Sequence, residues 1–155
     1  MIRTIAATLL AVLCTAAAAS ADPPAGVTYT GDAAAPISFG VALPAGTATF
    51  WISGIPPSAP YGDTKAQAES IIKKIDALLH AQGLTLSDIV YMRVYVVPDK
   101  TTGKVDFKGW FDAYAEYFGN ATNPTKPARS TIAVYALGNP EWSIEIEAFA
   151  AYPKH

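Results

Sequence analysis

The sequence contains very little cysteine or histidine. Of its 155 residues, one is cysteine, Cys14, and two are histidine. Cys14 lies in an N-terminal segment that we expect to be removed, which excludes disulfides and cysteine catalysis in the remaining chain. His80 falls inside a predicted helix and His155 is the last residue, and no His, Asp or Glu pair has metal-ligand spacing. The sequence therefore predicts no metal site.

Charged residues are also scarce, at 15%, and the formal net charge is −2. Basic residues never run beyond the pair Lys73-Lys74, whereas nucleic-acid binding needs a clustered basic face. Gly54, Gly62 and Gly83 are too scattered to form a phosphate-binding loop. These absences argue against nucleic acid as the partner and against a nucleotide-phosphate site.

The N-terminal segment has the layout of a secretory signal peptide. Arg3 is followed by an apolar run and then by Ala19-Ser20-Ala21, a small-x-small cleavage site. We expect residues 1–21 to be removed, the mature chain to start at Asp22, and the protein to be exported to the periplasm or secreted. A membrane anchor is the alternative, although the apolar run is short for a span. After cleavage no membrane association is expected.

The rest of the chain predicts one α+β domain. Residues 22–36 are rich in proline, alanine and glycine and are expected to form a flexible arm before a single domain at 37–155. Apolar residues at helical spacing predict two helices, and β-branched and aromatic runs predict strands. The order β-β-α-β-α-β-β places the helices on one face of a mixed sheet. The expected strands are 37–43, 47–55, 89–97, 126–137 and 138–150, and the expected helices are 64–82 and 106–118.

Two hairpins are expected within this order. Pro44-Ala45-Gly46 is a turn signal between the first two strands, and Gly138-Asn139-Pro140 is one between the last two. If the second loop has three residues, Arg129, Glu145 and Glu147 share one sheet face, and Arg129 lies about 13 Å from the position opposite Glu145. A four-residue loop would instead place Arg129 and Glu145 on opposite faces.

Arg129 is the main candidate for a functional side chain. It is a cation at the start of an otherwise apolar strand, and its planar guanidinium suits two-point binding of a carboxylate. The residue pattern leaves two interpretations open. Arg129 either forms a structural ion pair with Glu145, Glu147 or a chain end, or brackets a small molecule together with Glu145.

Several motifs, taken in order, resemble the RidA (YjgF-type) family of reactive imine and enamine deaminases. The motifs are "FWISGIPP" at 50–57, Gln67 in the first helix, "GLTLSDIVYMRVYV" at 83–96, "PARS" at 127–130 and "EIEAFA" at 145–150. The resemblance covers residues 37–152. It implies a chorismate-mutase-like α+β protomer that assembles as a homotrimer, with ligand sites in clefts between subunits and no cofactor.

The resemblance also implies roles for individual residues. Arg129 would hold the carboxylate of a 2-imino acid, and Glu145 would position the water that attacks the imine carbon. The products would be a 2-oxo acid and ammonia, as for a 2-iminobutanoate/2-iminopropanoate deaminase. Ser53 and Gly54 would line the pocket.

Three positions depart from the family pattern. Thr131 stands where the family has a cysteine, Phe111 aligns with a family asparagine, and the usual tyrosine falls near Ile37 or Phe39. Phe39, Phe111 and Thr131 would then line a more apolar substrate pocket. Two other functions stay open: a non-catalytic exported trimer that binds small carboxylates, and a ribonuclease role sometimes attributed to the family, against which the acidic net charge argues.

Overall fold

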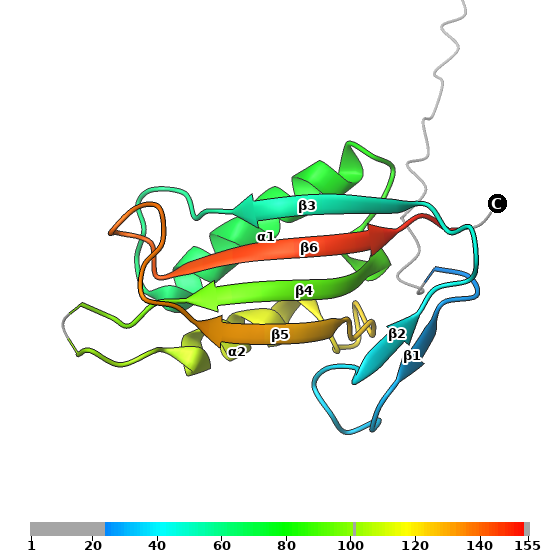
Figure 1. Cartoon of the computed structure of the whole chain (residues 1–155), viewed down its shortest axis with the longest axis horizontal. Helices are drawn as coiled ribbons and strands as arrows, with labels where there is room; N and C mark the ends of the chain where they lie inside the picture. Colours follow the sequence, from blue (N-terminus) through cyan, green and yellow to red (C-terminus); the bar gives the residue numbers. More distant parts are fainter. Residues whose placement is uncertain (1–23, 101, 154–155) are drawn as a thin grey trace, which may run out of the picture.

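The computed structural model describes residues 24–100 and 102–153, and the predicted signal peptide at 1–21 lies outside them. Within the described residues the chain forms a two-stranded sheet, a four-stranded sheet and two α-helices (Figure 1). Neither α-helix has the length and apolar character needed to cross a membrane. The elements are β1 (Thr28–Thr30), β2 (Gly40–Ala42), β3 (Thr49–Ile55), α1 (Thr64–His80), the short 3-10 helix η1 (Leu86–Asp88), β4 (Ile89–Val96), α2 (Phe107–Tyr117), β5 (Ala128–Ala133) and β6 (Ile144–Ala151).

The large sheet has the strand order β3-β6-β4-β5 (Figure 1). Strand β6 runs antiparallel to both β3 and β4, whereas β5 runs parallel to β4. The expected hairpin between the last two strands is therefore wrong, because β4 lies between β5 and β6. The chain reaches β5 from β4 through α2, and such a helical crossover brings the second strand back parallel to the first.

The expected first hairpin is also wrong. Strand β2 pairs with β1, which lies within the segment 22–36 that was predicted to be a loose arm. Strand β3 pairs instead with β6. Pro44-Ala45-Gly46 does turn the chain, but the turn carries it from the small sheet to the large one rather than closing a hairpin.

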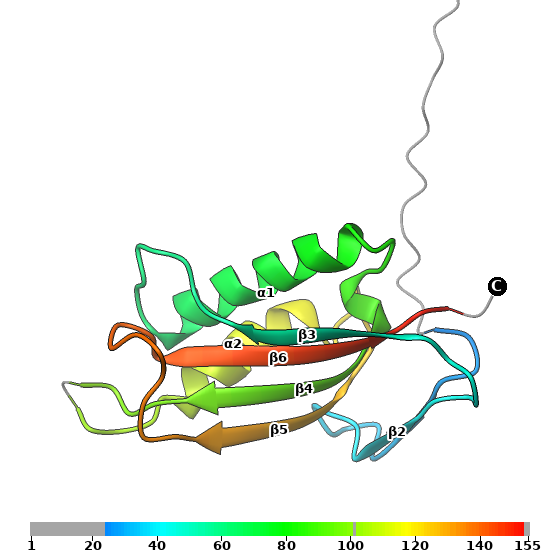
Figure 2. The same ribbon diagram turned by 45° about the horizontal axis from the view of Figure 1, so that its top comes forward.

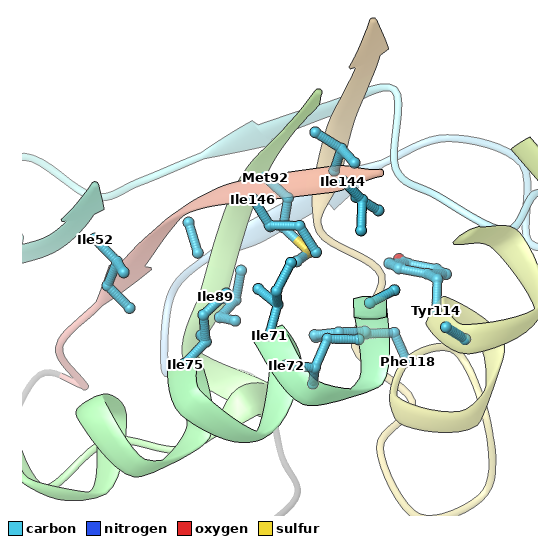
Figure 3. Packing of buried hydrophobic residues seen from close by; sticks show 14 of the residues in the cluster. Ile52, Ile71, Ile72, Ile75, Ile89, Met92, Tyr114, Phe118, Ile144 and Ile146 are labelled. Carbon is cyan, nitrogen blue, oxygen red and sulfur yellow. The ribbon is translucent and has the colours of Figure 1, made fainter. Parts of the chain in front are cut away.

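Both helices pack on the same face of the large sheet (Figure 2). The Asp63 side chain caps α1 and the Asp106 side chain caps α2, since each accepts a hydrogen bond from a backbone N–H in the first turn. Their inner faces form the core with alternate residues of the strands (Figure 3). The fully buried core side chains include Ile71, Ile72, Ile75, Met92, Val94, Trp110 and Ile146.

The other face of the sheet is not covered by any helix. Large apolar side chains are exposed there, with Trp51 at 71% exposure. Trp51 packs edge-on against Phe149, and Phe149 also contacts Tyr91. Exposed apolar side chains on an uncovered sheet face are typical of a surface that meets another protein chain.

Candidate functional site

The guanidinium of Arg129 is enclosed by three aromatic rings of α2. Its Cζ lies 4.3 Å from the ring centroid of Tyr114, 5.0 Å from that of Phe111 and 5.3 Å from that of Trp110. Arg129 is paired in register with Met92 on β4, whose side chain is fully buried under the helices. The arginine therefore points to the helical face of the sheet, where cation–π attraction to the rings partly replaces its lost hydration.

The same guanidinium has no anionic partner in the described part of the chain. Its Nη1 is buried without a hydrogen-bond acceptor, and no carboxylate of the described residues pairs with it. Burial lowers the pKa of Arg129, although an arginine stays charged at neutral pH. A buried donor without an acceptor is costly, so an incoming carboxylate that accepts from it would be bound favourably. The structural ion pair with Glu145 or Glu147 is not formed within the chain.

One hydrogen bond connects the aromatic rings around Arg129 to strand β5. Trp110 Nε1 donates a hydrogen bond to Thr131 Oγ1 at 3.2 Å, which fixes the indole next to Arg129. Tyr114 is buried, and burial raises its pKa to about 12 against the opposing effect of the Arg129 charge. The predicted pocket residue Thr131 therefore lies on the helical face with Arg129. Tyr114 was not singled out from the sequence, although its spacing of four residues from Trp110 places both on one helix face.

The predicted residue Phe111 contacts Arg129, and the predicted residue Phe39 follows a strand bridge to the residue before Arg129. Phe111 is 44% exposed and Phe39 is 73% exposed. Ser38 forms a parallel bridge with Ala128 at the free edge of β5, so residue 39 follows beside the position of Arg129. Arg129, Phe111, Thr131 and Phe39 thus form one group at this edge of the sheet, which we call the arginine half-site.

Glu145 belongs to a second group on the uncovered face of the sheet. It pairs in register with Tyr95 of β4, and next to it is Gly54 of β3. The register of β3 against β6 shifts at the stretch that holds Ser53 and Gly54. A Cβ at Gly54 would lie 3.0 Å from Cδ of Glu145 and would clash with its carboxylate oxygen. The absence of a side chain at Gly54 therefore makes room for the carboxylate. Ser53, Gly54 and Glu145 form what we call the glutamate half-site.

The two glutamates of β6 have different surroundings. Glu147 accepts a hydrogen bond from Tyr95 Oη at 3.1 Å and one from Arg93 Nη1 at 3.4 Å. The carboxylate of Glu145 has no hydrogen bond or ion pair to any described residue, so it remains available to a water molecule or a ligand. Arg93 and Tyr95 were not identified from the sequence. They are two residues apart on β4, as the two glutamates are on β6, so each pair projects from one face of its strand.

The two half-sites do not meet within one copy of the chain. Arg129 is level with Met92 on the helical face, whereas Glu145 is level with Tyr95 on the uncovered face. The two positions differ by about 10 Å along the strands and by two strand spacings of about 4.8 Å each. The alternative with a three-residue loop, in which Arg129 and Glu145 share a face, therefore does not hold, because both loop alternatives rested on the hairpin that β4 interrupts.

One cavity lies elsewhere, where both helices begin. It has a volume of about 990 Å³, and its lining includes Lys100, Tyr135 and Trp142 but neither Arg129 nor Glu145. Gln67 connects two loops beside this cavity, since its side-chain amide donates hydrogen bonds to the backbone carbonyls of Gly62 and Glu141. No group of three or more His, Cys, Asp or Glu side chains in the described ranges is placed to hold a metal ion.

A mixed four-stranded sheet with both helices on one face is the α+β fold of the YjgF and Rid protein structures. A family model described as endoribonuclease L-PSP matches residues 33–152, and the chain belongs to this family, the RidA/YjgF family. A RutC family protein of Pyrococcus horikoshii is 35% identical over 131 residues, which cover 80% of this chain and 95% of that protein.

Solved structures agree with this assignment. A protein of unknown function of the conserved Rid family from Yersinia pestis superposes with a TM-score of 0.60 at 29% identity, covering 76% of this chain and 87% of that one. A member of the YjgF/YER057c/UK114 family from Mycobacterium tuberculosis superposes with a TM-score of 0.56 at 26% identity, covering 81% and 99%.

Proposed function

We propose that the chain hydrolyses reactive 2-imino and enamine acids to 2-oxo acids and ammonia. In this proposal Arg129 holds the substrate carboxylate and Glu145 positions the attacking water. The observation that carries it is the charged, half-buried Arg129, which lies against three aromatic rings and has no anionic partner in the described chain. Glu145, whose carboxylate has no partner among the described residues, supplies the proton acceptor that such a hydrolysis needs.

The active site is proposed to form between two copies of the chain. Arg129 and Glu145 lie on opposite faces of one sheet, so one copy would supply the arginine half-site and its neighbour the glutamate half-site. The uncovered sheet face, with exposed Trp51 and with Ile132 at 43% exposure, supports burial against other copies. A closed ring of three copies satisfies this head-to-tail arrangement.

The proposed chemistry needs only water and these side chains. Arg129 orients the carboxylate next to the C=N bond, and Glu145 accepts a proton from water as the oxygen bonds to the imine carbon. The imine nitrogen takes up a proton from solvent, giving a tetrahedral carbinolamine. Glu145 then returns its proton to the amino nitrogen, the C–N bond breaks as the hydroxyl proton is released to solvent, and the 2-oxo acid and ammonia leave.

The test is hydrolysis of 2-iminopropanoate and 2-iminobutanoate freshly generated by an amino-acid oxidase. The chain should accelerate ammonia release over buffer, and Arg129→Ala and Glu145→Gln should each abolish that acceleration. Sedimentation of the wild type should give three times the chain mass. Wild-type ammonia release at the buffer rate would exclude the proposed enzyme.

A non-catalytic role is the second candidate, and it has an observation in its favour. Apart from Arg129, the arginine half-site contains only aromatic rings and the Thr131 hydroxyl, which already accepts from Trp110. Such a site binds a carboxylate without the help of Glu145. Small carboxylates that raise the melting temperature of a wild type without imine-hydrolysing activity would favour this role.

The description of the family model suggests RNA cleavage, but the charge of this chain disfavours it. The formal net charge is −2, and basic residues are not clustered in the sequence.

Export is also part of the proposal, because residues 1–21 have the layout of a signal peptide. Mass spectrometry of the mature protein should find Asp22 as the first residue, and an intact Met1 would contradict export.

A further inference from the structure

Two phenylalanines lie one helical turn apart on α2, next to Arg129. Phe107 and Phe111 stack with their ring centroids 6.2 Å apart and an interplanar angle of 16°. The side chain of Phe111 also lies under the guanidinium, with Arg129 Cζ 5.0 Å from its ring centroid. Phe107 is 37% exposed and Phe111 is 44% exposed. The two rings form a continuous apolar surface that starts at the cation, and we call it the aromatic ledge.

The polar groups beside the aromatic ledge are already paired. Lys108 Nζ and the Asp112 carboxylate, which flank the two rings in the sequence, form an ion pair with each other at 2.5 Å. Asp106 accepts a hydrogen bond from the backbone N–H of Gly109 and so serves as the helix cap. The ledge therefore offers a ligand aromatic carbon and no unpaired charge. A ligand that covers it gains by burying an apolar group.

We propose that the aromatic ledge selects organic acids with an aromatic side chain. This inference rests on the proposed function, because it takes Arg129 as the carboxylate site. With the carboxylate on the guanidinium, the rest of a small 2-imino acid projects over the ring of Phe111 and then toward Phe107. A methyl side chain covers little of this surface, whereas a phenyl side chain stacks on it. The substrate class is thus 2-imino acids derived from aromatic amino acids.

The experiment compares binding of two unreactive 2-oxo acids, phenylpyruvate and pyruvate, by calorimetry. Wild type should bind phenylpyruvate at least about tenfold more tightly than pyruvate. In Phe111→Ala the ratio of the two Kd values should fall to about one, and Phe107→Ala should lower it by a smaller factor. Phe111→Leu keeps an apolar side chain without the ring, and it should also lose most of the ratio.

Leu78→Ala is the matched control, because Leu78 is an apolar side chain of α1 with 40% exposure. It should keep the wild-type ratio. A wild type that binds pyruvate as tightly as phenylpyruvate, that binds neither acid, or that keeps its ratio in both Phe111 variants would overturn the inference. The measurement needs no turnover, so it separates the two proposals. Preferential binding of phenylpyruvate without imine hydrolysis supports the aromatic ledge and contradicts the proposed enzyme activity. Imine hydrolysis without preferential binding supports the enzyme activity and contradicts the aromatic ledge.

Discussion

Arg129 and Glu145 lie on opposite faces of one sheet, with strand β4 between the strands that carry them. A site that uses both must take them from different copies of the chain. This makes complementation a direct test. Arg129→Ala and Glu145→Gln should each be inactive alone, and an equal mixture that is unfolded and refolded together should regain about a quarter of the wild-type activity.

The fraction follows from random assembly, because one site in four then combines an intact arginine with an intact glutamate. The control is Arg129→Ala refolded with the double variant Arg129→Ala/Glu145→Gln, which contains no intact arginine. A first mixture that stays as inactive as this control, while both variants still assemble, would show that the two side chains do not work across an interface.

Replacement of Arg129 by methionine should separate stability from function. The change removes a buried cation that has no anionic partner, but it also removes three cation–π contacts. The two effects are each on the order of 1–3 kcal/mol and oppose one another, so the free energy of unfolding should change by less than about 1 kcal/mol. The kcat/KM for an imino acid should fall at least about 100-fold. Urea unfolding that shows a loss above about 3 kcal/mol would assign Arg129 a structural role.

Gly54→Ala should impair activity by displacing Glu145. The added Cβ would clash with the glutamate carboxylate, whereas a Cβ at Gly40 would have no atom within 4 Å. We expect imine hydrolysis to fall about 100-fold in Gly54→Ala and to be unchanged in Gly40→Ala. In a Glu145→Ala background, Gly54→Ala should cost less stability than in the wild type. Full activity of Gly54→Ala would mean that the position of this carboxylate does not matter.

Tyr114→Phe should make the protein more resistant to alkali. The Tyr114 hydroxyl is buried with no hydrogen-bond partner in the described chain, and its pKa is raised from 10.0 to about 12, mainly by burial. Between these two values the unfolded chain loses the proton and the folded chain keeps it, so stability falls as the pH rises through this window. Removing the hydroxyl abolishes this contribution.

Urea unfolding at pH 7 and pH 11 measures the effect. At pH 7 the variant should match the wild type within about 1 kcal/mol, because the hydroxyl makes no bond that phenylalanine would lose. At pH 11 it should be the more stable of the two. Tyr29→Phe is the comparison variant and should show a similar gain at pH 11, since burial also raises the pKa of Tyr29 to about 12. Equal losses in wild type and Tyr114→Phe on going to pH 11 would contradict the assignment.

Local patterns in the sequence predicted the helices well. The second helix was expected at 106–118 and is found at Phe107–Tyr117, because its aromatic residues recur with helical spacing and Asp106 supplies a cap. The β-branched run at 89–97 likewise became β4. These signals depend on neighbours only a few residues away, which a sequence displays directly.

Strand pairing was harder to predict, since it is decided between distant residues. The turn signals at Pro44-Ala45-Gly46 and Gly138-Asn139-Pro140 are real turns, but a turn does not specify which strand the chain joins next. The partner of β3 is β6, far along the sequence. The assumed hairpin left the sheet face of Arg129 undecided, and the contact of Arg129 with Tyr114 became visible only in the fold. The sequence did indicate the residue types of the candidate site, while the division into two half-sites required the fold.

The place of β6 in the sheet also bears on how the chain is made. It is the last of the described strands to be synthesised, yet it lies between β3 and β4, which are made long before it. Until β6 emerges, β3 has no partner in the large sheet, so the sheet cannot close during early elongation. The polypeptide therefore cannot complete the large sheet until β6 has been synthesised.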